Sequence, residues 1–504
     1  MKLSSSIQIK LGAILSYAGI VVYILVGLLY TPWMIKVIGK DDYGLYTLAY
    51  SVIAFFLFDF GISVAIQRFI SKYLSEKKSD EVNHCVSLVC KLYLLIDVFV
   101  LLAFVLIYFM MPYMYRELLP DQIDKLKIIF LMVGCYSVLT FPFLTLNGIL
   151  SAYEKFVQLK LCDLFSKIAT VSANVICLLC GGGLYAIVAT NIIVGFVVVI
   201  VKFVIVRRET TLKIIYRYYD KSELFNLLSF SGWTSVVALC QRCIFNIAPS
   251  ILAVFAKSDV IAVFGIAISL EGYTFTFAYA LNGMFMPKIS RILNSGDSIL
   301  PLMIRVGRIQ IIAMGIIIIG FILVGHDFIF AWLGEGFEQA YLCTLLLILP
   351  AFMLLPADIA DQTLIASGNI KYRAYVYIIM AVVNIMLSFL LTAFYGIVGL
   401  AFSIFISYMV RNVALYYMYK KILNVDIWAF AKQTFVKMFP GLIISFIISA
   451  LLITLINTSG WLYVGEKLII VFVIYIATMW LCVLNGEEKS LFISILRKLC
   501  RVKL

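Results

Sequence analysis

Apolar stretches of about 20 residues, the length of a helix that crosses a bilayer, recur along this 504-residue chain. Hydrophobic residues make up 64% of the sequence and charged residues only 13%, whereas soluble domains have roughly half and a quarter. A soluble fold would need solvated faces to interrupt such runs. The sequence therefore predicts an all-α polytopic membrane protein.

Fourteen apolar stretches are expected to be transmembrane helices, and turns such as Tyr395-Gly396 separate them. No connecting loop is long enough to form an extramembrane domain. The expected spans are Leu11–Tyr30, Leu45–Ser63, Val86–Met110, Leu126–Leu146, Val157–Cys180, Leu184–Val206, Leu227–Val254, Val260–Leu281, Ile309–Val324, Tyr341–Ile365, Tyr372–Phe394, Ile397–Tyr419, Phe439–Ile456 and Leu468–Leu484.

The distribution of Lys and Arg predicts the orientation of the chain. These residues collect in the cytoplasmic loops of membrane proteins. If the N-terminus is inside, 29 of the 40 Lys and Arg residues belong to inner loops and 7 to outer loops. We therefore expect an N-in, C-in topology with an even number of spans. The same bias accounts for the net charge of +13 without a nucleic-acid partner.

The first half of the chain is repeated in the second half at an offset of about 210 to 221 residues. The segment DYGLYTL at 42–48 matches VFGIAIS at 263–269, and AIQRFISKYL at 65–74 matches FMPKISRIL at 285–293. Pro142 has a counterpart in Pro356 and Asn174 one in Asn384. Because six spans return the chain to its starting side, both halves should have the same orientation.

This repeat predicts three parts. Residues 1–210 form an N-terminal six-helix bundle, residues 211–424 form a second one, and residues 425–504 contain two further helices and a cytoplasmic tail. Two parallel-repeat bundles leave a cleft between them, which suits alternating access by rocking. The organisation therefore favours a carrier over a channel.

Motifs for soluble catalysis or nucleotide hydrolysis are absent from the sequence. There is no GxxxxGK[ST] stretch, no paired CxxC spacing among the eleven Cys residues, and the two His residues lie far apart. We therefore expect that the protein is not an enzyme and that it has neither a metal site nor a cofactor. Energy for uphill movement would come from a proton or sodium gradient, or from the gradient of the substrate itself.

Four basic residues within or beside the spans are candidates for substrate binding. They are Arg68, Lys91, Arg242 and Lys288. A charge inside an apolar span is costly and should face a bundle interior or water. Arg binds two phosphate oxygens with its planar fork, and Lys acts as a point charge. A cavity lined by these residues would suit an anionic head group.

Four acidic residues are candidates for ion coupling or for pairing with these cations. Asp59 lies in the second expected span and Glu271 in the eighth, while Asp358 and Asp361 are three residues apart in the tenth. Like charges on one helix face raise one pKa, as a proton site requires, but a pair at a helix end in water is an equal alternative. Three further charges have structural interpretations. Asp163 and Lys167 are expected to form a local ion pair. Arg411 is expected either to pair with Asp358 or Asp361 or to extend its side chain towards the cytoplasmic surface.

Several segments resemble one family of membrane proteins. The segments PWMIKVIGKDDYGLYTL (32–48), DFGISVAIQRFISKYL (59–74) and YGIVGLAFS (395–403) resemble the polysaccharide transporter (PST/Wzx-type) family of the multidrug/oligosaccharidyl-lipid/polysaccharide exporter superfamily. The resemblance implies a MATE-like fold of two six-helix bundles around a V-shaped cavity.

The resemblance also implies a function. It implies a flippase in the bacterial inner membrane for oligosaccharides linked to undecaprenyl diphosphate, the repeat units of O-antigen in lipopolysaccharide, capsule or exopolysaccharide. Membrane lipids and polysaccharide polymerase machinery would be its partners. In related lipid II flippases, cavity arginines bind the diphosphate, and only Arg68 and Arg242 match such roles here.

Two other classes of membrane protein are alternatives to this function. A cation-coupled multidrug exporter of the MATE type would share the fold but prefer an acidic, aromatic cavity. An integral polymerase or glycosyltransferase would fit the apolar helices, but the repeat and the short loops disfavour it.

Overall fold

The structure is a computed structural model that describes residues 5–57, 60–213, 215, 218, 220–279, 285–456, 458–486, 488–490 and 493. Every regular element in this part of the chain is a helix, and twelve of its helices are long and apolar enough to cross a membrane. The prediction of an all-helical multi-pass membrane protein is therefore confirmed. The helices form two compact units, of which one contains the chain up to Ser269 and Ile370–Ser407, and the other contains the rest.

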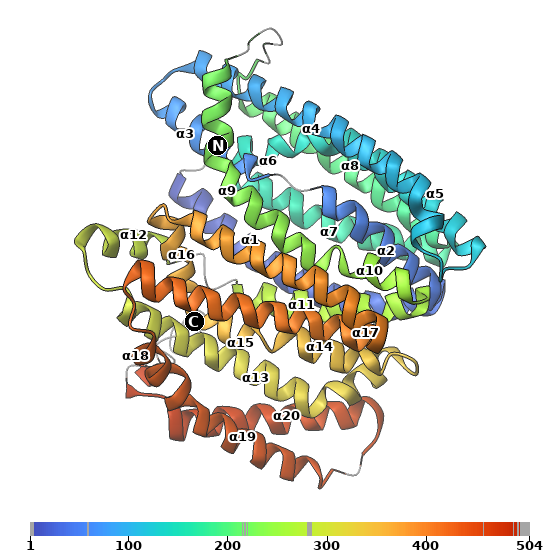
Figure 1. Ribbon diagram of the computed structural model, residues 1–504, viewed down its shortest axis with the longest axis vertical. Helices are drawn as coiled ribbons and strands as arrows, with labels where there is room; N and C mark the ends of the chain where they lie inside the picture. Colours follow the sequence, from blue (N-terminus) through green and yellow to red (C-terminus); the bar gives the residue numbers. More distant parts are fainter. Residues whose placement is uncertain are drawn as a thin grey trace, which may run out of the picture. The chain divides into compact units, whose positions relative to one another are not determined.

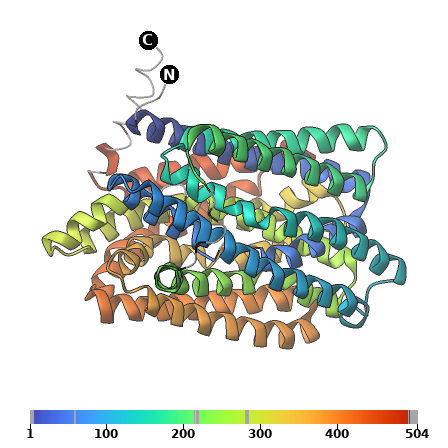
Figure 2. The same cartoon turned by 90° about the horizontal axis from the view of Figure 1, so that it is seen from above.

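The first unit is built from long helices that run alongside one another. In both views α4, α5, α7 and α8 form such a group (Figures 1 and 2). The elements of this unit are α1 (Ser5–Ile38), α2 (Lys40–Phe56), α3 (Ile62–Ser75), α4 (Ser79–Met114), α5 (Pro120–Thr140), η1 (Phe141–Leu144), α6 (Thr145–Ala152), α7 (Phe156–Leu179), α8 (Leu184–Glu209), α9 (Lys221–Phe245), α10 (Ala248–Phe255) and the first parts of α11 (Ser258–Tyr279) and α17 (Ile370–Leu423).

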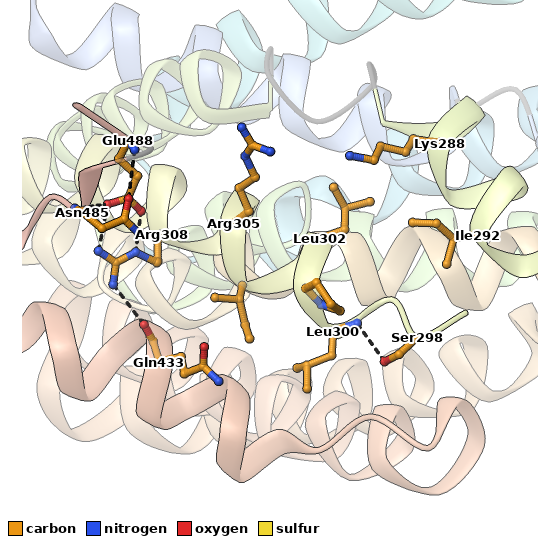
Figure 3. Close-up of a pocket in the computed structure, with 12 residues that line it drawn as sticks. Lys288, Ile292, Ser298, Leu300, Leu302, Arg305, Arg308, Gln433, Asn485 and Glu488 are labelled. Carbon is orange, nitrogen blue, oxygen red and sulfur yellow. Dashed lines mark hydrogen bonds and ion pairs between the residues drawn. The ribbon is translucent and has the colours of Figure 1, made fainter. Parts of the chain in front are cut away.

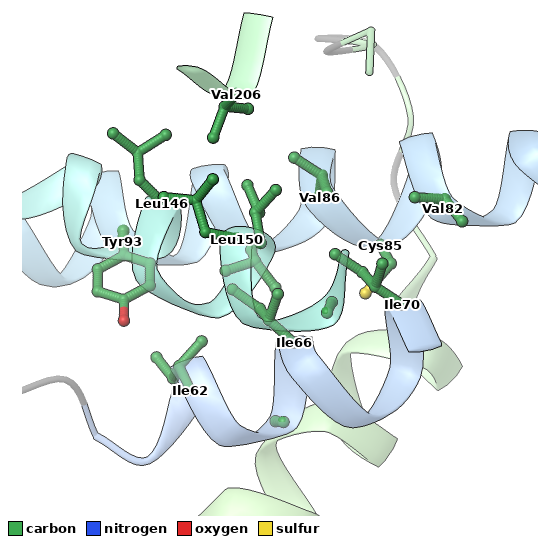
Figure 4. Close-up of a cluster of buried hydrophobic side chains, with 14 of the residues drawn as sticks. Ile62, Ile66, Ile70, Val82, Cys85, Val86, Tyr93, Leu146, Leu150 and Val206 are labelled. Atoms are coloured by element: carbon green, nitrogen blue, oxygen red, sulfur yellow. The ribbon is translucent and has the colours of Figure 1, made fainter. Parts of the chain in front are cut away.

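The short helix α3 is held in place by an apolar stripe. Its buried face includes Ile62, Ile66 and Ile70, which are one helical turn apart and pack against α4 and α6 (Figure 4). A Cβ atom on Gly148 of α6 would lie 2.8 Å from the carbonyl oxygen of Ser63, so a glycine is needed where α6 meets α3. The opposite, polar face of α3 carries Arg68.

The second expected span, Leu45–Ser63, is not one continuous helix. The helix α2 ends at Phe56, and α3 begins at Ile62. Phe60 and Gly61 have positive φ values of 51° and 67°, and a right-handed helix cannot continue through such residues. The prediction of an unbroken helix here was therefore wrong.

The longest helical segment, α17, is bent at the turn that the sequence predicted. Its 54 residues contain a non-helical residue, Gly396, with φ 57° and ψ −138°. The hydroxyl groups of Ser388 and Ser403 lie 2.7 Å apart, seven residues on either side of the bend at Tyr395 and Gly396. This contact requires the chain to reverse direction, so α17 consists of two antiparallel arms.

The second unit contains the paired helices α19 and α20, which pack beside α13. At this contact, the hydroxyl of Tyr475 donates a hydrogen bond to the carbonyl oxygen of Ile312 at 2.8 Å. The elements of this unit are the remaining parts of α11 and α17, α12 (Met286–Ser295), α13 (Leu300–Leu333), α14 (Gln339–Ile348), α15 (Ala351–Leu354), η3 (Leu355–Ala357), α16 (Asp358–Ala366), α18 (Ile427–Ala431), η4 (Lys432–Val436), α19 (Lys437–Ile453), α20 (Gly460–Thr478) and η5 (Met479–Val483).

The order of elements is repeated along the chain as the sequence repeat predicted. Pro142 lies in the 3-10 turn η1 before the short helix α6, and Pro356 lies in the 3-10 turn η3 before α16. The long helices α4 and α13 have 36 and 34 residues. In addition, α3 packs against α6, as α12 packs against α16. The two prolines thus break the fourth and tenth expected spans at equivalent points.

Candidate functional site

The loop that enters α2 connects three helices of the first unit. Gly39, just before α2, has a φ of 91°, which favours glycine. Asp41 in the first turn of α2 accepts hydrogen bonds from the hydroxyl of Ser258 and, at 3.4 Å, from Gln122 of α5. Asp42 accepts a hydrogen bond from Lys125 at 2.9 Å. The segment VIGKDDYG therefore holds the N-terminal ends of α2, α5 and α11 together.

The predicted basic residues are divided between the two units. Arg68 of α3 belongs to the first unit and Lys288 of α12 to the second, and both side chains are exposed. Lys91 of α4 donates a hydrogen bond to the carbonyl oxygen of Tyr218 at 2.7 Å. Arg242 of α9 donates to the carbonyl oxygen of Ala54. Lys91 and Arg242 thus already bind backbone oxygens of neighbouring segments.

The predicted acidic residues differ in their surroundings. Asp59 lies outside the residues that the structure describes. Asp358 and Asp361 lie in the first turn of α16, where the helix dipole stabilises acidic groups. They are 4% and 5% exposed, so the alternative of a helix-end pair in water is wrong.

Glu271 of α11 forms part of a buried polar cluster in the second unit. It is 5% exposed, and Arg411 of α17, 3% exposed, attracts it electrostatically. The Arg411 guanidinium donates two hydrogen bonds to the side-chain oxygen of Asn412, at 3.2 and 3.1 Å, and lies 4.2 Å from the ring centre of Tyr408. Asn412 in turn donates to the carbonyl oxygen of Pro350 at 3.0 Å. This network fixes the Arg411 cation, which the sequence alone could not connect with Glu271.

A cavity of about 550 Å³ in the second unit is lined by Lys288, among other residues. Figure 3 shows the Lys288 and Arg305 side chains at this cavity, with Arg308 and Glu488 joined beside them. Lys288 comes from α12, and both arginines come from the first turns of α13. The cavity is therefore positively charged, and one carboxylate partly neutralises it.

The ion pair between Arg308 and Glu488 is a feature that the sequence analysis missed. Arg308 donates hydrogen bonds to both carboxylate oxygens of Glu488 and to the carbonyl oxygens of Gln433 and Val483. The two residues are 6% and 4% exposed. Their separation of 180 positions hides the contact in the sequence. The one available signal was an acidic pair, GEEKS, in an otherwise basic tail.

The described part of the chain contains no group of three or more His, Cys, Asp or Glu residues that could hold a metal ion. Amide and tyrosine side chains form some of the polar contacts between the helices. For example, Asn191 of α8 donates hydrogen bonds to the hydroxyls of Tyr46 and Tyr50 at 3.2 Å each.

Membrane transporters and flippases of known structure share this helical architecture. The lipid II flippase MurJ in an inward closed conformation matches with a TM-score of 0.66 at 15% identity, over 94% of this chain and 97% of the flippase. An inward-facing MATE family multidrug transporter of the MOP superfamily matches with a TM-score of 0.64 at 13% identity, over 83% of this chain and 99% of the transporter. The Vibrio cholerae MATE transporter VcmN in its bent form matches with a TM-score of 0.53 at 14% identity, over 85% and 99% of the two chains. The fold is thus of the MATE and lipid II flippase class.

The sequence identifies the family within this class. Residues 10–293, more than half of the chain, match the family described as polysaccharide biosynthesis protein. The chain belongs to this family, which confirms the resemblance seen at residues 32–48 and 59–74. No curated protein sequence matches the chain significantly.

Proposed function

We propose that this protein is a flippase that moves oligosaccharide repeat units linked to undecaprenyl diphosphate across the bacterial inner membrane. The match of residues 10–293 to the polysaccharide biosynthesis family carries this proposal. The twelve candidate membrane helices and the fold of flippases and transporters support it. The translocated repeat units would be used in the synthesis of O-antigen, capsule or exopolysaccharide. A polysaccharide polymerase would be a partner in this synthesis.

The proposed topology has fourteen spans with both termini inside. Counting the two arms of α17 separately and adding α2 raises the twelve candidate spans to this number. The excess of Lys and Arg in alternate loops supports the orientation. Residues 1–210 and 211–424 would form the two bundles that alternate in access, and residues 425–504 would add two helices.

In this proposal, the basic residues bind the diphosphate. The acidic residues pair with these cations when no diphosphate is bound, or carry a coupling proton. Arg68, Arg242, Lys91 and Lys288 would contribute positive charge at different stages of the passage. Glu271, Asp59, Asp358 and Asp361 would pair with cations in the empty protein or carry a coupling proton. For Glu271 this role has a specific basis, because Arg411 is buried in the same unit and acts on it.

The test is complementation of a deletion strain. We expect Arg242→Gln to abolish surface polysaccharide while the protein remains in the membrane, because the neutral side chain cannot bind phosphate as a cation. Arg116→Gln is the matched control, since Arg116 is an exposed arginine outside the proposed path. Normal polysaccharide in the Arg242→Gln strain would contradict the assignment of this residue.

A cation-coupled multidrug exporter is the alternative, and its support is the shared fold with MATE transporters. A deletion strain distinguishes the two functions. Altered sensitivity to cationic dyes with intact polysaccharide would favour the exporter. Loss of polysaccharide with unchanged dye sensitivity would favour the flippase.

A further inference from the structure

A second charged cavity lies within the first unit, bordered by α1, α7 and α8. Its volume is about 440 Å³. Three lysines line it, Lys160 and Lys167 from α7 and Lys202 from α8, together with Asp163. We refer to these four residues as the lysine pocket. The cavity is of the size that proteins use for small ligands and head groups.

The contacts within the lysine pocket differ from those that the sequence predicted. Asp163 was expected to pair with Lys167; it attracts Lys167 electrostatically, but its short contacts are with two other lysines. The Asp163 carboxylate instead lies 3.0 Å from the ammonium of Lys202 and 3.7 Å from that of Lys160. Lys202 also donates a hydrogen bond to the side-chain oxygen of Asn147 at 3.0 Å. Lys202 on the adjacent helix α8 and Lys160 on α7 are thus the close partners of Asp163 in place of Lys167.

Lys167 makes weaker direct contacts than Lys202, although Asp163 attracts it electrostatically. Its ammonium donates to the carbonyl oxygen of Gly19 at 3.4 Å, the long limit of a hydrogen bond, and lies 4.7 Å from the ring centre of Tyr23. An ammonium has three donors, so its capacity for an anion is largely unused. Lys160 and Lys167 are seven positions apart on α7, so their Cα atoms are about 10 Å apart along the helix axis.

The charges of the lysine pocket do not balance. One carboxylate faces three ammonium groups, so the pocket carries two excess positive charges. Cations within membrane helices are costly when they lack anionic partners and are typical of substrate paths. A bound dianion would balance the charge and supply acceptors for Lys160 and Lys167. Phosphate and diphosphate esters have this charge and these acceptors.

We propose that the lysine pocket binds the phosphate groups of the lipid-linked substrate. The inference rests on the proposed function and adds a phosphate-binding position to those proposed for the four predicted cations. Lys91 and Arg242 already donate to backbone carbonyls, and Lys288 belongs to the other unit. Lys160 and Lys167 line a cavity and leave donors available.

The test measures binding to the purified full-length protein in nanodiscs of neutral lipid. The probes are undecaprenyl diphosphate, inorganic pyrophosphate and vesicles of phosphatidylglycerol. The variant is Lys160→Gln with Lys167→Gln. Lys202 is left unchanged, because its bonds to Asp163 and Asn147 connect α8 to α7 and α6.

We expect the double variant to bind undecaprenyl diphosphate at least tenfold more weakly, because the two neutral side chains cannot form charge-assisted hydrogen bonds with the phosphate oxygens. The charge-preserving pair Lys160→Arg with Lys167→Arg should restore most of the binding. The control is Lys127→Gln, because Lys127 also lies over an aromatic ring, that of Tyr108, at 5.7 Å. A melting temperature equal to that of the wild type shows that each variant is folded.

Three results would overturn the proposal. Unchanged binding of undecaprenyl diphosphate would exclude the pocket as its site. An equal loss for phosphatidylglycerol would show a general site for anionic lipid, and a loss confined to pyrophosphate would show a site for free phosphate. The proposed function fails separately, if the wild-type protein binds no undecaprenyl diphosphate at all.

Discussion

Gly44 of α2 and Gly265 of α11 occupy the same position in the two halves of the repeat, and each lies against the other's helix. A Cβ atom on Gly44 would lie 1.9 Å from the carbonyl oxygen of Ser258 in α11. A Cβ atom on Gly265 would lie 2.9 Å from the side chain of Thr47 in α2. The repeat therefore places its paired glycines at one helix crossing, where a side chain on either would separate the helices.

This crossing predicts that Gly44→Ala destabilises the protein. The nearest atom is a backbone oxygen, which cannot rotate away, so the two helices must move apart. We expect a loss of about 1–3 kcal/mol, the usual cost of overpacking. The measurement is thermal unfolding of the purified protein. Gly465→Ala is the control because a Cβ atom there meets no atom within 4 Å, and an equal effect at both positions would contradict the crossing.

The buried pair of Arg308 and Glu488 predicts a larger effect. Glu488→Gln removes the negative charge and leaves Arg308, which is 6% exposed, without its carboxylate. Breaking a buried pair by removing one partner costs about 3–5 kcal/mol. We expect lower protein levels in the membrane and a lower melting temperature. Glu466→Gln, at a surface carboxylate bonded to Thr458, should change neither, and a silent Glu488→Gln would show that the pair adds little.

The same pair predicts a dependence of stability on pH. Burial alone raises the pKa of Glu488, but the hydrogen bonds from Arg308 and Asn485 outweigh burial and hold the pKa below its usual value of 4.5. The pair therefore stabilises the folded protein above about pH 4.5, and this contribution is lost as the pH falls through the lowered pKa. Melting temperatures from pH 7 to pH 3 should fall more steeply for the wild type than for Glu488→Gln. Parallel curves would contradict this assignment.

The sequence predicts the membrane helices well because each span is a long local signal. It also predicts the order of the repeat and the bend at Gly396, because glycine and proline affect the backbone conformation at their own positions in the chain. It fails where a helix is interrupted within an apolar run. The break between Phe56 and Ile62 is one example, because apolar composition continues across the break while the backbone turns at Phe60 and Gly61.

Polar contacts within the membrane were predicted less well, because they depend on which helices are neighbours. Asp163 and Lys167 are four residues apart on one helix, the spacing expected for an ion pair. The Asp163 carboxylate nevertheless makes its closest contact with Lys202 of α8. Glu271 and Arg411 are 140 positions apart and share no motif. Without the packing of the helices, a sequence can identify costly charges but not their partners.

Glu271 and Arg411 allow a test that separates pairing from proton coupling. Each single change, Glu271→Gln or Arg411→Gln, removes the electrostatic interaction between two buried groups and should lower the free energy of unfolding by about 1–3 kcal/mol. The double variant should cost less than the sum of the two, because neither charge is then left alone. Melting temperatures of the four proteins check this coupling, and additive losses would contradict it.

Surface polysaccharide gives the second measurement. If Glu271 carries a proton during transport, the double variant regains stability but makes no polysaccharide. If Glu271 only neutralises Arg411, polysaccharide returns together with stability.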